Sequence, residues 1–480
     1  MSRSVRSGRP GREAGYVPVT RSVRSARPLR QAWQPRRAAR GFVALALCAA
    51  AGGAGLAAAA PANAASATTT ATSGRSLAAN TRFFVPPPSS GAVSQVLSLV
   101  RSGDLKDAAL LTKMAATPQA VWLTSGTPAQ VGTQVRQTLG ESALERAVPV
   151  FVAYDVPGRD CAEYSAGGAT DQTAYDAWID GLTNGLGHSK AVILVEPDAL
   201  GNMPSNCGLP TSVYPFTDAE RTAEISYAVT SLEKDPNASV YLDGTNSDWQ
   251  SVGTISQRLL AANVQGSQGF FLNVSNYQST PELADYGTWI SDCIAMVTDP
   301  ANWSYGQPGN CASQYYPATQ GDFSTWNLST QWYAQNMGTA VATTHFVVDT
   351  SRNGVGPNEM AAYAAAPYNQ SAGVISTLVA GNWCNPTNVG LGLTPSANTG
   401  TPLLDAYLWV KIPGQSDGQC DAAGGVRAWD YTTYTQPGWP TTAADQNLFD
   451  PLWGVDDPAA GAWFPQQALQ LAQDAQPPLK

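Results

Sequence analysis

The sequence predicts an α/β protein built on a parallel barrel of seven strands, and three observations lead to this class. Seven short runs rich in β-branched and aromatic residues have the composition of buried strands. Segments with apolar residues at helical spacing lie between them, which is typical of parallel βα units. Several runs end in a carboxylate, and barrel enzymes place their functional side chains at such strand ends. An open doubly wound sheet is the alternative, but no G-x-G-x-x-G follows the first run.

The individual elements can be placed from the pattern. The expected strands are Ala120–Thr124, Val148–Tyr154, Ala191–Glu196, Ser239–Asp243, Gly269–Val274, His345–Asp349 and Ala406–Ile412. The clearest helical patterns are Asp171–Leu186, Asp218–Lys234 and Ser251–Asn263. We interpret Asp218 as the N-cap of its helix, since apolar positions follow it at helical spacing.

Residues 1–64 have the features of an export signal rather than of a folded segment. Eleven arginines precede an apolar run over residues 41–60, and Ala62-Asn63-Ala64 matches the A-x-A cleavage pattern. The pair Arg36-Arg37 is typical of twin-arginine export. We therefore expect a secreted, extracellular protein without a membrane anchor, because no second apolar stretch is long enough to span a bilayer.

The remaining chain divides into a short leader and one long domain. Residues 65–80 are rich in Ser, Thr and Ala and are expected to be disordered. Residues 81–480 show no long linker and no repeat, so we expect a single domain. Residues 65–480 hold 16 basic and 35 acidic residues, a net charge of about −19. Such an acidic protein repels phosphate backbones, which excludes nucleic acid as an expected partner.

Cysteine and histidine usage narrows the chemistry further. Six cysteines follow the signal, an even number that suggests three disulfides with 15 possible pairings. No C-x-x-C pair occurs, and we expect no metal and no cofactor. The only histidines, His188 and His345, are expected to be structural, and no G-x-S-x-G elbow is present. Chemistry must then rest mainly on carboxylates.

Carboxylates follow five of the expected strands. They are Asp160, Asp198, Asp243, Asp349 and Asp417. A single aspartate at such a place is more often a helix cap, but parallel strands put all five at one face of the sheet. Crowded carboxylates hold protons more tightly, so that one can stay protonated while its neighbour is ionised.

Tryptophans supply the second half of the pattern. The chain has 14 of them, and many lie in Gly/Pro/Asn-rich, loop-like sequence rather than in apolar runs. Core packing is the usual role of any single tryptophan, but flat rings on loops also stack on the C–H faces of pyranoses. Paired carboxylates beside aromatic platforms are typical of glycosidases.

With these residues the chain resembles glycoside hydrolase family 6, the inverting cellulases, over about residues 83–478. The motifs that carry the resemblance are Gly158-Arg-Asp-Cys161, Val195-Glu-Pro-Asp198, Asn273-Val-Ser-Asn-Tyr277, Asp349-Thr-Ser-Arg-Asn-Gly354, Asn398-Thr-Gly400 and Trp409-Val-Lys-Ile-Pro-Gly414. The resemblance implies a distorted seven-stranded barrel that hydrolyses β-1,4-glucan with inversion at the anomeric carbon. The expected partner is a β-1,4-glucan chain, and we expect a monomer.

The resemblance also implies roles for single residues. Asp198 matches the general acid, and Asp160 matches the neighbouring carboxylate that raises its pKa and orders water. Asp417 matches the candidate base, with a water relay through Asp160 as the alternative. Tyr154 resembles the residue that forces the reacting sugar out of its chair. The positions that match sugar-binding residues are Trp122, Thr124, Trp249, Asn276, Trp383, Lys411 and Gln415. Asp243 and Asp349 resemble supporting carboxylates, with a purely structural role as the alternative, and Arg159 and Arg352 resemble orienting groups rather than catalysts.

Three positions depart from the family pattern. Asn246 stands where the family usually has histidine, Gln415 where it has glutamate, and Ala166 where a serine is frequent. Both amides keep hydrogen-bonding capacity but lose charge, which affects the sugar contacts expected there. The disulfides implied by the resemblance are Cys161–Cys207, Cys384–Cys420 and Cys293–Cys311.

Two segments, 292–328 and 421–462, exceed what a bare barrel needs and are expected to fold over the active face. In the resembled family, loops that roof the cleft into a tunnel accompany release of cellobiose from chain ends. We therefore expect an exo-acting cellobiohydrolase, with an open-cleft endoglucanase as the alternative. A non-catalytic glucan-binding wall protein is the remaining hypothesis, although a binder has no need of three converging aspartates.

Overall fold

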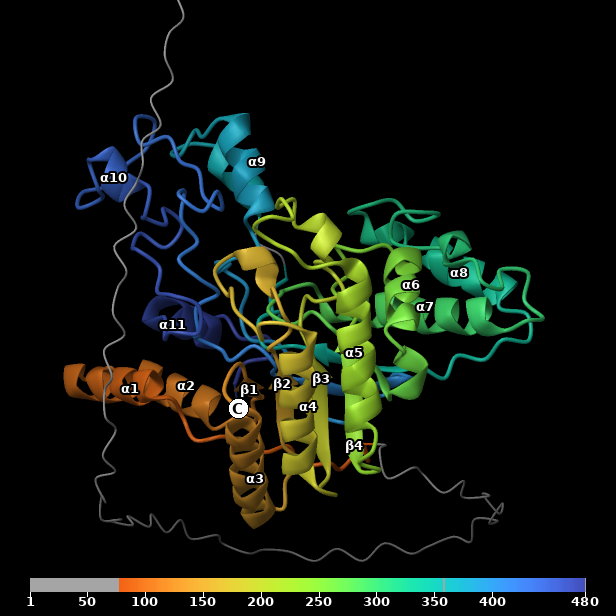
Figure 1. The fold of residues 1–480 in the computed structure, drawn as a ribbon. Coiled ribbons are helices and arrows are strands. Elements are labelled where there is room, and N and C mark those ends of the chain that lie inside the picture. Colours follow the sequence, from red (N-terminus) through yellow and green to blue (C-terminus); the bar gives the residue numbers. More distant parts are fainter. Residues whose placement is uncertain (1–76, 357–358, 480) are drawn as a thin grey trace, which may run out of the picture. The chain divides into compact units, whose positions relative to one another are not determined.

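Seven parallel strands form one sheet whose order follows the chain, as the computed structural model shows (Figure 1). They are β1 (Val121–Leu123), β2 (Val150–Ala153), β3 (Ala191–Val195), β4 (Ala238–Asp243), β5 (Gly269–Leu272), β6 (His345–Asp349) and β7 (Leu404–Leu408). Each overlaps one predicted run, so the predicted fold class and strand count are confirmed. The sheet is curled but does not close into a full barrel. The described parts of its two edge strands, β1 and β7, are not paired with each other by strand hydrogen bonds. A single backbone bond joins their flanks, from the amide of Ala120 to the carbonyl of Trp409 at 3.0 Å.

The structure describes residues 77–356 and 359–479, which belong to one compact unit, Thr69–Lys480. The predicted export signal and most of the predicted leader lie outside the described residues. Within these two ranges, no helix is both long enough and apolar enough to cross a membrane.

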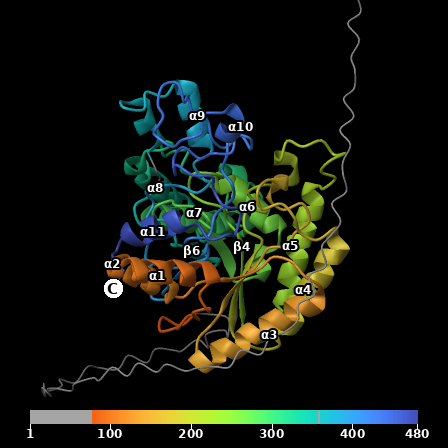
Figure 2. The same cartoon turned by 90° about the vertical axis from the view of Figure 1, so that its left-hand side faces the viewer.

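Helices precede β1, fill the connections between the strands and follow β7. They are α1 (Ser90–Ser102), α2 (Leu105–Ala115), α3 (Pro128–Glu145), α4 (Gln172–Leu186), α5 (Asp218–Leu232), α6 (Val252–Ala261), α7 (Thr280–Thr298), α8 (Asn327–Asn336), α9 (Ala372–Ala380), α10 (Ala443–Gln446) and α11 (Pro465–Gln473). Helices α3, α4 and α5 lie side by side against one face of the sheet, and α6 packs against α7 (Figures 1 and 2). The three predicted helices are confirmed as α4, α5 and α6.

The predicted start of α5 needs a correction. Its N-cap is Thr217, whose side chain accepts from the backbone N–H of Glu220 while the Glu220 carboxylate accepts from the N–H of Thr217. This reciprocal capping box satisfies two donors at the helix start. Asp218 is instead the first helical residue, and its carboxylate accepts from the backbone and hydroxyl of Ser205.

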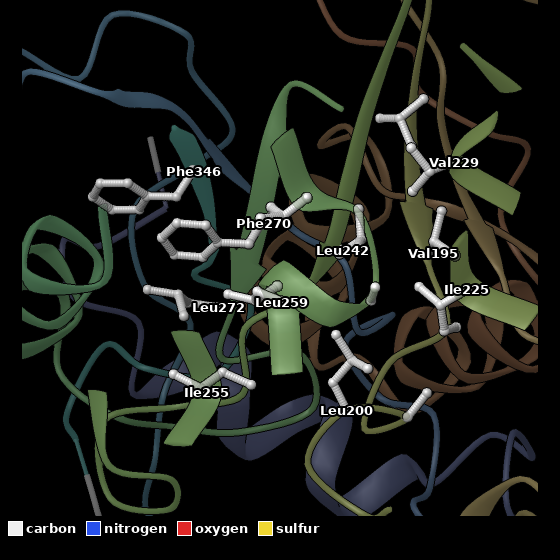
Figure 3. Close-up of a cluster of buried hydrophobic side chains, with 14 of the residues drawn as sticks. Val195, Leu200, Ile225, Val229, Leu242, Ile255, Leu259, Phe270, Leu272 and Phe346 are labelled. Atoms are coloured by element: carbon white, nitrogen blue, oxygen red, sulfur yellow. The ribbon is translucent and has the colours of Figure 1, made fainter. Parts of the chain in front are cut away.

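The core has two layers because the side chains of each strand alternate between the two faces of the sheet. Phe151, Ile193, Leu242 and Phe270 point outward into the helices, where Phe270 stacks on Phe346 with ring centroids 5.5 Å apart (Figure 3). A second set fills the barrel interior and includes Val152, Leu194, Tyr241, Phe271, Val347 and Leu408. This packed interior leaves the strand ends as the place where side chains can reach solvent.

Candidate active site

Asp160 lies in the loop after β2, on backbone with a positive φ of 58°. Aspartate tolerates this left-handed conformation better than bulkier residues, and such strain gathers at functional sites. The backbone N–H of Ser165 donates to its carboxylate at 2.6 Å. Burial raises the pKa of Asp160 to about 6, although this N–H bond opposes the rise. The carboxyl is therefore poised to exchange a proton near neutral pH.

Asp198 follows β3, again on left-handed backbone, with φ of 66°. Burial raises the pKa of its carboxyl well above the usual range, and the charges of Asp243, Asp160 and Asp417 raise it further. Clustered carboxylates cannot all ionise together, so one of them retains its proton. Of these carboxyls, Asp198 is therefore the one whose surroundings favour the protonated form most strongly.

Asp417, in the segment after β7, is held between two cations. Its carboxylate lies 2.6 Å from the guanidinium of Arg352 and 2.8 Å from the ammonium of Lys411. The backbone N–H of Asn385 adds a bond at 2.8 Å. Burial alone would raise the pKa of Asp417, but the two cations lower it below its ordinary value. Asp417 is therefore ionised and a weaker proton acceptor than Asp160.

These three carboxylates share one pocket of about 390 Å³. Its wall also includes most of the residues predicted to bind sugar, namely Trp122, Thr124, Tyr154, Asn276, Trp383, Lys411 and Gln415. Ala166 and Arg159 line it as well. The strand ends thus bring together groups that lie almost 300 residues apart in the chain. The pocket combines an acid that holds its proton with two carboxylates of lower pKa.

Tyr154 is fixed within this wall by its neighbours. The guanidinium of Arg159 lies 4.7 Å from the centre of the Tyr154 ring, and Trp122 meets that ring edge-on at 5.4 Å. The same guanidinium donates to the carbonyl oxygen of Thr124 at 2.7 Å. Arg159 therefore holds the Tyr154 ring and the Thr124 backbone in place within the wall.

Trp249, Asp243 and Asp349, which were also predicted for the site, do not line this pocket. The Trp249 ring lies over Gly201, where a Cβ would come within 2.4 Å of it. Asp243 and Asp349 are buried beneath the loops. Each accepts backbone N–H bonds from loops of adjacent strands, Asp243 from Leu200 and Gly201 and Asp349 from Ser275, Val410 and Lys411.

Glu196, the last residue of the predicted third strand, has the same function just after β3 and was not among the predicted site residues. Its buried carboxylate accepts from the backbone N–H groups of Asp155 and Val156 at 3.0 and 3.1 Å. Burial raises the pKa of Glu196 to about 8, against the effect of these bonds. The only feature of the sequence that could have indicated this role is the position of Glu196 at the end of a predicted strand. Its use as a loop anchor depends on a contact with β2 that no local pattern reveals.

Tyr164 is a pocket residue that the sequence analysis missed. Its hydroxyl donates to the Asp421 carboxylate at 3.0 Å, and its ring lies 6.4 Å from Trp383. Gly418 and Gly424 pack on it so closely that a Cβ at either would come within 2.4 Å of the side chain. The loop after β2 and the loop after β7 therefore touch beside the catalytic candidates.

The implied disulfides are present and brace these loops. Cys161–Cys207 joins the loop of Asp160 to the loop after β3, and Cys384–Cys420 closes the segment that holds Asp417. Cys293–Cys311 ties α7 to the long segment that follows this helix. All three pairings agree with those that the resemblance implied.

The two long segments differ in what they cover. Ala460 and Gly461 of segment 421–462 line the pocket, and Asp421 bonds to Tyr164. No residue of segment 292–328 lines it, because this segment packs instead on α8 and on the start of α6. The expected cover is therefore contributed by the second segment.

A second pocket of about 390 Å³ adjoins the first. The two share Trp122, Thr124, Gln415 and Gly461, so they meet at the first strand. From there the second pocket extends toward Pro86–Pro88 and Trp463. The groove is therefore longer than the part that holds the three carboxylates.

Comparison with known proteins shows which family and which relatives this chain is similar to. The family described as "Glycosyl hydrolases family 6" matches residues 78–475. Endoglucanase 1 of Streptomyces halstedii is 31% identical over 73% of this chain and 85% of its own length. A probable 1,4-beta-D-glucan cellobiohydrolase C of Neosartorya fischeri is 27% identical over 76% of this chain and 71% of its own length.

A solved structure is similar over most of the chain. It is the endoglucanase Cel6 from Mycobacterium tuberculosis in complex with methyl-cellobiosyl-4-deoxy-4-thio-beta-D-cellobioside. The identity is 31% and the TM-score 0.55, with 82% of this chain and 98% of that chain covered. Relatives of both names, endoglucanase and cellobiohydrolase, are thus similar to this chain.

Proposed function

The chain belongs to glycosyl hydrolases family 6, cellulases that hydrolyse β-1,4-glucan, and on this basis we propose that it is an inverting cellobiohydrolase. The observation that carries the proposal is the single pocket in which Asp160, Asp198 and Asp417 have different proton affinities. An inverting glycosidase needs one acid and one base on opposite sides of the scissile bond. The opposed pKa values supply this pair.

In the proposed reaction the Asp198 carboxyl protonates the glycosidic oxygen as the bond from that oxygen to the anomeric carbon breaks. A water oxygen forms the new bond to the same carbon from the opposite face, and its proton passes to Asp160. We assign the proton to Asp160 because its pKa of about 6 suits a general base near neutral pH. Asp417, ionised between Arg352 and Lys411, partly offsets the charge of these two cations beside the positive charge that develops on the sugar ring.

Replacement of the acid tests catalysis itself. Asp198→Asn is expected to lower kcat on cellotetraose by about 10²–10⁴-fold, the usual contribution of a general acid. The control Asp107→Asn, at a half-buried position of α2 outside the pocket, should retain wild-type activity. Proton NMR of the first product formed by the wild type should show the α-anomer. Equal sugar release by wild type and Asp198→Asn would refute an enzymatic function and favour a glucan-binding protein.

The contact between Tyr164 and Asp421 supports exo action. It joins two loops beside the pocket, and such closure hinders entry of an internal segment of a long chain. We expect slow viscosity loss of carboxymethylcellulose relative to the release of soluble sugar. Tyr164→Ala should raise viscosity loss per bond cleaved, whereas Tyr164→Phe, which keeps the ring, should change it less. A wild type with a steep early viscosity drop would contradict exo action.

An endoglucanase is the second candidate, and the adjoining pocket favours it. That pocket continues the groove past Trp122, so the glucan is not forced to end there. Several relatives are named endoglucanases. The same viscosity assay separates the two candidates.

We further propose that the chain acts outside the cell as a monomer on its polysaccharide. The three disulfides support the extracellular location, because disulfides persist in oxidising compartments. Sequencing the N-terminus of the protein from culture medium would test cleavage after Ala64, and sedimentation would test the oligomeric state.

A further inference from the structure

The exposed aromatic side chains of the described residues gather in one short segment. They are Trp303, Tyr305, Tyr316 and Phe323, with exposed fractions of 58, 55, 77 and 44%. The other aromatic side chains of the described ranges are buried or half-buried. Large apolar rings are costly to leave in water, and an exposed cluster commonly marks a binding surface. We call these four residues the aromatic patch.

The segment that carries the aromatic patch is braced from below. It joins α7 to α8 at the right-hand side of Figure 1, and the Cys293–Cys311 disulfide ties it to α7. Trp303 meets Trp332 edge-on at 6.1 Å, and Phe323 meets the buried Trp326 at 5.3 Å. These contacts hold two of the rings in place before any partner binds, which lowers the entropic cost of binding.

The surroundings of the patch select a neutral partner. Residues 300–321 contain no Asp, Glu, Lys, Arg or His, and Asn, Gln, Ser and Thr separate the rings. Asp322, next to Phe323, is the one charged residue between Trp303 and Phe323, and its carboxylate accepts from the N–H and the hydroxyl of Ser324. Flat rings among uncharged hydrogen-bonding groups suit the C–H faces and hydroxyls of a neutral sugar chain. A charged polymer would find no counter-charge within residues 300–321.

The same segment contacts the predicted sugar-binding loop. The hydroxyl of Tyr315 donates to the carbonyl oxygen of Trp249 at 3.1 Å, and the Gln314 amide donates to that of Gln250 at 2.8 Å. Tyr316, the most exposed ring, directly follows Tyr315 in the chain. The aromatic patch is therefore attached to the loop that carries Trp249.

We propose that the aromatic patch is an accessory binding surface for β-1,4-glucan, separate from the pocket, which holds the enzyme on insoluble substrate. The proposal rests on the family's activity toward β-1,4-glucan, but not on exo action. A surface of this kind raises the local concentration of the pocket at the polymer and contributes nothing when the substrate is a short soluble chain.

Adsorption separates the patch from catalysis. The variant Trp303→Ala/Tyr305→Ala/Tyr316→Ala/Phe323→Ala and the wild type are mixed with phosphoric-acid-swollen cellulose at 4 °C, and the free protein is measured. The affinity of the quadruple variant for the cellulose should be at least about tenfold lower, since aromatic side chains that become buried on binding contribute most of the energy of an interface. Its kcat and KM on soluble cellotetraose should remain at wild-type values, which also shows that it is folded. The control Leu105→Ala/Leu144→Ala removes two exposed aliphatic side chains elsewhere and should adsorb as the wild type does.

Each other outcome counts against the proposal. Unchanged adsorption by the folded quadruple variant overturns it. A wild type that sediments as a dimer, together with a monomeric variant that adsorbs normally, would assign the patch to self-association instead. If the quadruple variant loses cellotetraose activity, Trp303→Ala and Tyr316→Ala are tested singly, and normal adsorption by both overturns the proposal. Failure of the proposed function would be visible separately, as absence of cellotetraose hydrolysis by the wild type.

Discussion

The pH profile of Asp160→Asn is the most direct test of the proposed roles, Asp198 as the general acid and Asp160 as the general base. With a pKa of about 6, the ionised form of Asp160 outnumbers the protonated form by about tenfold at pH 7. For the wild type, kcat/KM should fall below about pH 6 as this base gains a proton. It should fall again at high pH, when Asp198 loses the proton that its neighbours help it to keep.

Asparagine has nearly the same shape and can still accept the Ser165 N–H bond, so the loop should keep its conformation. The substitution removes one negative charge that raises the pKa of Asp198. The alkaline limb should therefore move toward lower pH by about one unit, which corresponds to about 1.4 kcal/mol. The limb near pH 6 should disappear, and kcat/KM at pH 7 should fall by about 10²–10³-fold.

The assay is initial-rate hydrolysis of cellotetraose from pH 4 to pH 10. Glu163→Gln is the matched control, because Glu163 is an exposed carboxylate of the same loop whose charge raises the pKa of Asp160. It should move only the acid limb, slightly toward lower pH, and leave the maximal rate unchanged. An Asp160→Asn enzyme that keeps its acid limb, or whose alkaline limb does not move, would refute the assignment.

Two further predictions concern stability. Lys411→Met leaves a buried Asp417 with one cation and should lower the free energy of unfolding by about 3–5 kcal/mol in urea titrations at pH 7. The pKa of Asp417 is lowered by folding, so its ionic stabilisation is present above the unfolded value and is lost as pH falls through the folded value. The deficit of the variant should thus shrink in strong acid, and a deficit independent of pH would contradict the ion-pair explanation. Gly287→Ala places a Cβ 2.4 Å from the Phe346 ring and should destabilise by about 1–3 kcal/mol, whereas Gly140→Ala, with open space around it, should stabilise the protein slightly. Equal thermal shifts for the two variants would contradict the packing explanation.

The strands were predictable because each is a compact run of apolar residues buried on both faces of the sheet. Asp160, Asp198 and Asp417 could be grouped for a related reason, since parallel strands bring their carboxyl ends to one rim. The family resemblance added the roles that these positions suggest. Local pattern and topology were thus sufficient to group the three aspartates. The sugar-binding positions came from the resemblance, which included Trp249, outside this pocket, and left out Tyr164.

What could not be predicted depends on contacts between remote loops. The bond between Tyr164 and Asp421 joins residues 257 positions apart, and neither has a periodic pattern around it. The path of segment 292–328 was unpredictable for the same reason, because its length indicates that it must fold somewhere but not on which surface. The N-cap at Thr217 was a narrower error, since Thr217 and Asp218 are both good caps and only the reciprocal bonds to Glu220 distinguish them.

Glu196, Asp243 and Asp349 have a consequence for protein engineering. Each secures backbone that follows a neighbouring strand. A graft of one loop from a related enzyme would bring the new segment but leave its anchor behind, on a strand that the graft does not include. The unit to transfer is thus a loop together with the acidic residue that anchors it from the end of the neighbouring strand. Chimeras that include both parts should retain the loop geometry of the enzyme from which the loop was taken.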